Sequence, residues 1–262
     1  MKFKKIKQLS ICICIAILAL NLVSCGKDKE KEKPKEKPKK AEINIGAINK
    51  AYKDVLVENQ TGISTYSWQM DKNNNPVSKP VAIKDINGDK IPELFFVTAN
   101  SQWEASLHIY TYINGQAKEV GYQHTDQNAD ALKIINVAAG TDYMVYQGKT
   151  DGSLYIISSM GDESITYSVS KYTFKDGRLT RDDYFSNRIG PNENYSGRVD
   201  IYKHQGKEIS ASEGKKLFGD AGADVKGVII YSGYEKDISA WNKFQIGEEL
   251  SLSYQDAIRQ LS

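Results

Sequence analysis

The strongest constraint on the fold is a hairpin pattern that occurs twice. A gap-free alignment joins SLHIYTYINGQAKEVGY (residues 106–122) with SVSKYTFKDGRLTRDDY (residues 168–184). Both stretches have Tyr-Thr-aromatic before the turn and a tyrosine seven residues after its glycine. The turns are Asn114-Gly115 and Asp176-Gly177, and such dipeptides supply the positive φ that a two-residue hairpin turn needs. We therefore expect two antiparallel hairpins with equivalent positions.

The similarity extends upstream of the hairpins. LFFVT at 94–98 corresponds to LYIIS at 154–158, which gives an internal repeat offset by about sixty residues. A degenerate third hairpin is predicted at 198–209. This period suits an antiparallel meander of three to four strands, such as a propeller blade or one sheet of a sandwich. Two ordinary hairpins can also share this frame by coincidence, because Asn-Gly and Asp-Gly turns are common.

Helices are predicted at both ends of this strand-rich region. Residues 43–59 carry an apolar stripe at three- and four-residue spacing, and Thr61-Gly62 is expected to end that helix. Short helices are predicted at 209–219 and 253–262, where Ser210 and Ser253 are the expected N-caps, and a strand at 227–234. The predicted class is mainly β, with one domain over residues 43–262.

The first 24 residues have the features of a secretory address. Four lysines within residues 2–7 precede an apolar run, Leu9 to Leu20, that is too short to span a bilayer. The run closes with Leu-Val-Ser-Cys, which resembles the lipobox of bacterial lipoproteins. That resemblance implies that residues 1–24 are removed and that Cys25 carries the lipid. The protein is then anchored on the extracytoplasmic face of the cell membrane. An ordinary signal peptide that contains a cysteine is the alternative.

A charged segment follows the lipobox. Residues 25–42 are rich in Lys, Glu and Pro and are expected to form a disordered tether. Residues 41–262 carry 23 basic and 29 acidic side chains, a net charge of −6. This sign argues against nucleic acid as a partner. Beyond Cys25 the chain has no cysteine, which excludes a disulfide, a thiolate nucleophile and a Cys-ligated zinc site in the domain.

The stretch KDINGDKIPELFFV (residues 84–97) places side-chain oxygens at alternate positions. Calcium takes six to eight oxygen ligands, and a compact turn can direct alternate residues inward. An EF-hand is excluded because Phe96 and Lys90 stand where that loop requires Glu and Gly. An Asn87-Gly88 turn with solvated acids, which needs no ion, is the alternative.

This loop resembles those of FG-GAP and VCBS-type repeats, and short loops in small lipoproteins of low-GC bacteria. The resemblance covers one loop and its strands. It implies a calcium site, and the sequence departs from the family pattern at Lys90, where the family usually has Gly. The repeat's second copy keeps only Asp151-Gly152 and is expected to bind no metal. The implied ligands are Asp85, Asn87, Asp89, the backbone carbonyl of Ile91, and Glu93.

Catalytic motifs are sparse. The sequence contains no G-x-S-x-G, H-E-x-x-H or P-loop. His108 is expected to be exposed on a strand. Asp182 and Asp183 are expected to face opposite sides of a strand, which makes them a poor acid pair.

These features favour a non-catalytic binding module over an enzyme. Trp103 is a candidate contact for a glycan or a peptide, although aromatic residues in strands more often serve packing. The alternative is an extracytoplasmic hydrolase that acts on cell-wall glycan or peptide, because paired acids can come from distant positions. The substrate-binding subunit of an importer ranks lower because such proteins alternate strands and helices.

Overall fold

The computed structural model describes residues 43–66, 79–101, 104–123, 135–137, 142–160, 164–192, 194–231 and 248–262. The predicted signal segment, Cys25, the tether and Trp103 lie outside these residues. Residues Ile43–Ser262 form one compact unit. Of the helices in the described part of the chain, none combines the length and apolar character needed to cross a bilayer.

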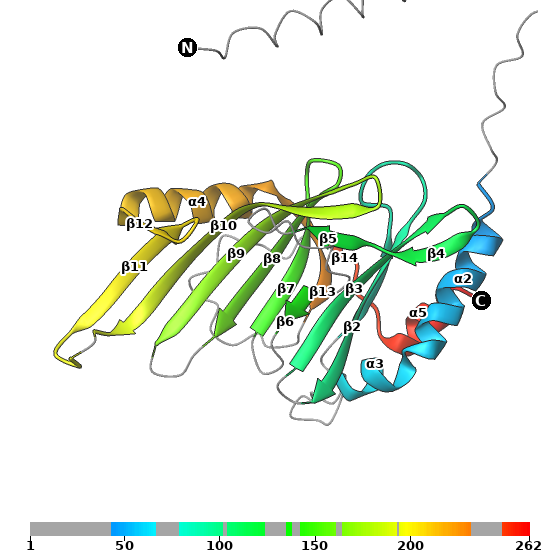
Figure 1. The fold of residues 1–262 in the computed structure, drawn as a ribbon, viewed down its shortest axis with the longest axis horizontal. Helices are drawn as coiled ribbons and strands as arrows, with labels where there is room; N and C mark the ends of the chain where they lie inside the picture. Colours follow the sequence, from blue (N-terminus) through cyan, green and yellow to red (C-terminus); the bar gives the residue numbers. More distant parts are fainter. Residues whose placement is uncertain are drawn as a thin grey trace, which may run out of the picture. The chain divides into compact units, whose positions relative to one another are not determined.

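Two sheets make up most of this unit (Figure 1). The smaller sheet has the order β1-β2-β3-β4, and β6 also pairs with β3; all its pairings are antiparallel. Its strands are β1 (Val81–Lys84), β2 (Glu93–Ser101), β3 (Glu104–Ile113), β4 (Gln116–Glu119) and β6 (Ile135–Val137).

The larger sheet has nine strands in the order β12-β11-β10-β9-β8-β7-β13-β14, with β5 beside β10. The pairings of β5 with β10 and of β14 with β13 are parallel, and the others are antiparallel. Its strands are β5 (Gly121–Gln123), β7 (Asp142–Gly148), β8 (Ser153–Met160), β9 (Ile165–Lys175), β10 (Arg178–Pro191), β11 (Arg198–His204), β12 (Lys207–Ile209), β13 (Val225–Tyr231) and β14 (Glu248–Glu249).

The predicted repeat folds as two three-stranded units in the same register. In the first unit Tyr110 of β3 lies opposite Leu94 of β2 and Glu119 of β4. In the second, Tyr172 of β9 lies opposite Leu154 of β8 and Arg181 of β10. All three predicted hairpins form, with positive φ at both central residues of each turn. The mainly β class is confirmed. The described strands stay in two open sheets and close into neither a barrel nor a propeller.

The helices of the described residues are α2 (Ile45–Glu58), α3 (Gln60–Tyr66), α4 (Ala211–Asp224) and α5 (Tyr254–Gln260). Ser210 and Ser253 cap α4 and α5 as predicted, each accepting a backbone N–H three residues on. The helix predicted at 43–59 forms as α2 and ends at its C-cap, Asn59. The residues predicted to end it, Thr61 and Gly62, lie inside α3. Gly62 instead allows α3 to approach β2 closely: a Cβ on it would lie 2.8 Å from the Cβ of Thr98.

Side-chain alternation on β2 separates two apolar layers. Leu94 and Phe96 pack with residues of α2, α3 and α5 in one core cluster. Phe95 and Val97 face the other way and pack against the larger sheet. A third cluster joins the opposite face of the larger sheet to α4. In Figure 1, α2, α3 and α5 accordingly gather beside the smaller sheet, and α4 lies against the larger one.

Candidate functional site

The loop between β1 and β2 is held by hydrogen bonds from its own side chains. The two carboxylate oxygens of Asp85 accept the backbone N–H groups of Gly88 at 2.8 Å and Lys90 at 2.9 Å. Asn87 accepts the N–H of Asp89 at 3.0 Å, and Asp89 accepts that of Ile91 at 2.7 Å. Such bonds from Asx side chains to nearby backbone stabilise a turn without any ion.

Lys90 adopts a left-handed backbone conformation. Its φ is +74°, a value that favours glycine and costs a residue with a Cβ about 1 kcal/mol. The loop therefore keeps the backbone geometry of a glycine position although it carries a lysine.

Glu93 is the buried end of the loop. Its side chain is 0% exposed, and its oxygens accept the N–H of Ile86 at 3.0 Å and the hydroxyl of Thr111 at 3.4 Å. Burial is the main cause that raises the pKa of the Glu93 carboxyl to about 8. The negative charges of Asp89 and Asp85 act in the same direction, and the hydrogen bond from Ile86 opposes them. Burial disfavours the charged form because it removes water from the carboxylate.

The structure brings together part of the predicted calcium ligand set. Asn87 Nδ2 lies 3.1 Å from Asp89 Oδ2 and 3.5 Å from Glu93 Oε1. Asp85 is instead directed at the backbone of the loop. In the described part of the chain, no three His, Cys, Asp or Glu side chains stand close enough together to hold a metal ion. The loop as it stands is a hydrogen-bonded turn, and calcium would require its carboxylates to converge further.

The second copy of the repeat contributes Asp151 to the same region. Asp151 Oδ2 would lie 3.1 Å from a Cβ added at Gly88, and Gly152 N–H donates to the carbonyl of Ile86 at 2.6 Å. From the sequence, Asp151 is expected only to belong to a loop that binds no metal. Aligning the two repeat loops does not reveal that Asp151 lies beside Gly88. That proximity depends on how the two sheets pack together, which the sequence does not show.

These loops border a cleft of about 430 Å³ between the tips of the two repeated hairpins, which we name the inter-hairpin cleft. Polar and apolar groups both line it. They are Asn87, Asp89, Ile91 and Asp151 from the loops, and residues 111–113 and 173–177 from the hairpins.

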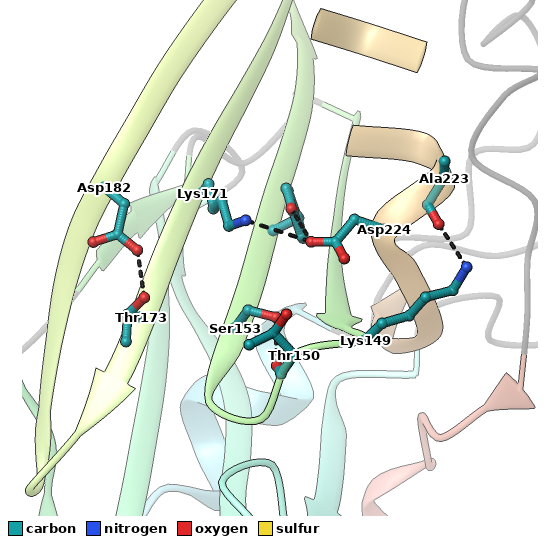
Figure 2. A network of polar contacts seen from close by, with 9 residues as sticks. Lys149, Thr150, Ser153, Lys171, Thr173, Asp182, Ala223 and Asp224 are labelled. Atoms are coloured by element: carbon teal, nitrogen blue, oxygen red, sulfur yellow. Dashed lines mark hydrogen bonds and ion pairs between the residues drawn. The ribbon is translucent and has the colours of Figure 1, made fainter. Parts of the chain in front are cut away.

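A second cleft of about 350 Å³, named the α4 cleft, lies between α4 and the larger sheet. Tyr155 donates its hydroxyl to Asp224 Oδ2, and Lys171 Nζ lies 3.4 Å from the same oxygen (Figure 2). Burial is the main cause that raises the pKa of Tyr155 to about 12. The pKa of Lys171 is raised mainly by its contact with the Tyr155 hydroxyl and to a smaller extent by the charge of Asp224.

His108 is not exposed as predicted but 9% exposed, because helices cover its face of the sheet. It stacks on Phe96 with ring centroids 4.8 Å apart. Its Nε2 lies 3.0 Å from Thr98 Oγ1, and its Nδ1 donates to Glu119 at 2.8 Å. Thr98, His108 and Glu119 are thus linked in the order hydroxyl, imidazole, carboxylate, which is the order found in sites of nucleophilic catalysis. Thr98 is closely covered by Gly62 of α3, so we interpret the three groups as a structural cross-strand network.

The prediction for Asp182 and Asp183 also needs correction. Arg181 lies opposite Tyr172 and Asp183 opposite Lys171, so Asp182 is an extra residue in β10. Such a bulge shifts the alternation of side chains. Asp182 accepts the hydroxyl of Thr173, and Asp183 lies beside Lys171 in the α4 cleft. The bulge therefore places both acids on one face.

The fold and the site define a β-rich protein of two open, packed sheets with helices on both outer faces, an Asx-rich loop and two clefts. No protein-family model, curated protein or solved structure matches the chain.

Proposed function

We propose that this protein is a lipid-anchored extracytoplasmic binding module that acts without catalysis, with a cell-wall glycan or a peptide as its ligand. The lipobox at residues 22–25 and the charged segment after it support the anchor. The binding role rests on the α4 cleft. Two donor groups that line it, Tyr155 and Lys171, keep their protons near neutral pH.

Catalytic acids and bases work best when their pKa lies near the working pH. The pKa of Tyr155 is raised to about 12 and that of Lys171 is raised as well. Tyr155 therefore stays neutral and Lys171 stays charged, and both serve as fixed hydrogen-bonding groups. Glu93 has a pKa of about 8, but it is 0% exposed and lines neither cleft.

We also propose that the loop between β1 and β2 binds calcium through Asp85, Asn87, Asp89, the carbonyl of Ile91, and Glu93. The carboxyl of Glu93 supports this proposal. Burial and the nearby negative charge of Asp89 both disfavour its ionised form, and a bound dication would compensate that negative charge. The expected affinity is about 10⁻⁴ to 10⁻³ M, as in extracellular modules.

Labelled palmitate tests the anchor. The wild-type protein should incorporate the label and fractionate with membranes, and the Cys25→Ala variant should do neither because it lacks the thiol that accepts lipid. A Cys12→Ala variant, altered in the segment to be removed, should behave like the wild type. Absence of label in the wild type would refute the anchor.

Co-sedimentation with isolated cell walls tests the binding role. The detergent-solubilised mature protein should pellet with the walls, and the supernatant should gain no soluble sugar or peptide. Release of soluble product that grows with time would show a hydrolase instead. Failure to pellet would leave the proposed binding role without a ligand in the wall and would count against it.

A further inference from the structure

The α4 cleft collects polar groups from three consecutive strands and from α4. Tyr155 comes from β8, Lys171 from β9, Asp183 from β10, and Asp220 and Asp224 from α4. The bulge in β10 is what brings Asp183 to this face, opposite Lys171. Bulges commonly redirect a side chain next to a functional site.

Each carboxylate of the cleft already has a donor partner. Asp224 Oδ2 accepts from Tyr155 and Lys171. Asp183 Oδ1 lies 2.6 Å from His204 Nε2 and accepts from Gln205 at 2.9 Å. Asp220 Oδ2 accepts from Lys216 at 2.6 Å. Among the described residues, these contacts use one oxygen of each carboxylate, so the other oxygen is an acceptor that a ligand could use.

The cleft also contains donors and an apolar wall. Lys171 Nζ lies 5.3 Å from the centre of the Tyr155 ring and 3.4 Å from Asp224. An ammonium group has three donors, which leaves N–H groups beyond the one directed at Asp224. Figure 2 shows Lys171 pointing along the sheet toward Asp224, near the end of α4. Phe185, Leu217 and Ala221 supply the apolar wall.

We propose that the α4 cleft binds a neutral sugar unit of a polysaccharide. This inference rests on the proposed binding function and names its ligand class and site. Hydroxyl groups of the sugar donate to Asp183, Asp220 and Asp224, and a sugar oxygen accepts from Lys171. The C–H face of the ring lies on the apolar wall. The cleft volume of about 350 Å³ falls within the range of about 300–1,000 Å³ typical of small-ligand sites.

A cationic ligand fits the cleft less well. The ring face of Tyr155 and the carboxylate of Asp224, which would attract a foreign ammonium group, already serve Lys171. Of the three aspartates in the lining, Asp224 pairs with Lys171 and Asp220 with Lys216. The protein's own ammonium groups therefore offset much of the negative charge that would attract a foreign cation. A neutral ligand rich in hydroxyl groups needs only acceptor oxygens and no uncompensated charge.

Calorimetric titration of the mature protein in a sugar-free detergent tests the proposal. The probes are tetra-N-acetylchitotetraose, maltotetraose and 1,5-diaminopentane. At least one oligosaccharide should bind saturably and the diamine should not. Lys171→Met and Asp220→Ala should each weaken that binding by about tenfold, since hydrogen bonds to charged groups contribute roughly that factor.

Asp54→Ala is the matched control for Asp220→Ala. Asp54 on α2 also pairs with a lysine four residues before it, and its side chain is 63% exposed against 62% for Asp220. The control should bind like the wild type. Binding of the diamine alone, or of no probe, would overturn the proposal.

Wall co-sedimentation separates this inference from the proposed function. If Lys171→Met and Asp220→Ala pellet with walls as the wild type does, the binding role stands and the α4 cleft is not its site. If the wild type releases soluble product from walls, the non-catalytic function fails whatever the variants do.

Discussion

Glu93 places a carboxyl group at the start of β2 and inside the space between the sheets, where it is 0% exposed. Burial, aided by the charges of Asp89 and Asp85, raises its pKa to about 8. In an unfolded chain a glutamate titrates at about 4.3. The folded protein therefore keeps this proton over a pH range in which the unfolded chain has lost it.

Glu93→Gln should remove a pH dependence of stability. Between about pH 4.3 and pH 8 the folded wild type binds more protons than the unfolded chain, so its free energy of unfolding falls as the pH rises. The slope from this group is at most about 1.4 kcal/mol per pH unit. Glutamine can keep the hydrogen bond to Ile86 without titrating. Urea unfolding in EDTA should show a variant more stable than the wild type at about pH 8 and close to it at about pH 5.

Glu58→Gln is the control for that experiment, because Glu58 is an exposed glutamate on α2. It should leave the wild-type slope unchanged. A wild type whose stability rises steadily from about pH 5 to pH 8 would contradict the role given to Glu93.

At the scale of elements, the hairpins were predictable because turn chemistry is local. Asn114, Asp176 and Gln205 all adopt positive φ beside a glycine, as the turns require. Gly62 was misinterpreted as a helix end because its role depends on Thr98, a residue of another element. The bulge at Asp182 likewise depends on how β10 pairs with β9. How one element packs on or pairs with another leaves no comparable mark on the local pattern.

Comparing Gly62→Ala with Gly46→Ala tests whether α3 is packed tightly against β2 at Gly62. A Cβ at Gly62 would lie 2.8 Å from the Cβ of Thr98, whereas at Gly46 the nearest atom would be 3.5 Å away. Alanine favours a helix over glycine by up to about 1 kcal/mol. Gly46→Ala should therefore stabilise slightly, while Gly62→Ala should lower the free energy of unfolding by about 1–3 kcal/mol through overpacking. Chemical denaturation measures both, and equal stabilisation by the two changes would show that α3 can move away from β2.

Across the whole molecule, the two repeats meet at their loop ends. Asp151 of the second copy approaches Gly88 of the first, and the inter-hairpin cleft opens between the paired tips. The sequence indicated the loop residues from Asp85 to Glu93, since they are contiguous. It did not indicate either cleft, because their walls come from positions that only the packing of the sheets and α4 brings together.

Calcium should stabilise the molecule more at high pH than at low pH. A proton on Glu93, whose pKa is about 8, competes with the cation, because metal ligands bind in the deprotonated form. With a Kd of about 10⁻⁴ to 10⁻³ M, about 10 mM calcium adds roughly 1.4–2.7 kcal/mol when Glu93 is ionised. The melting temperature should then rise by about 3–10 °C near pH 8.5, and by less near pH 6.

Sodium chloride at matched ionic strength is the first control, since residues 41–262 carry a net charge of −6 that any salt screens. Asp89→Asn should reduce the calcium effect because it removes a ligand charge from the loop. Asp54→Asn, which changes an exposed aspartate on α2, should not. A melting temperature that responds equally to calcium and to matched sodium chloride would leave the loop as the hydrogen-bonded turn formed by Asp85, Asn87 and Asp89. In that case the two sheets are held at this end by contacts such as the Gly152 N–H bond to Ile86, with no requirement for an ion.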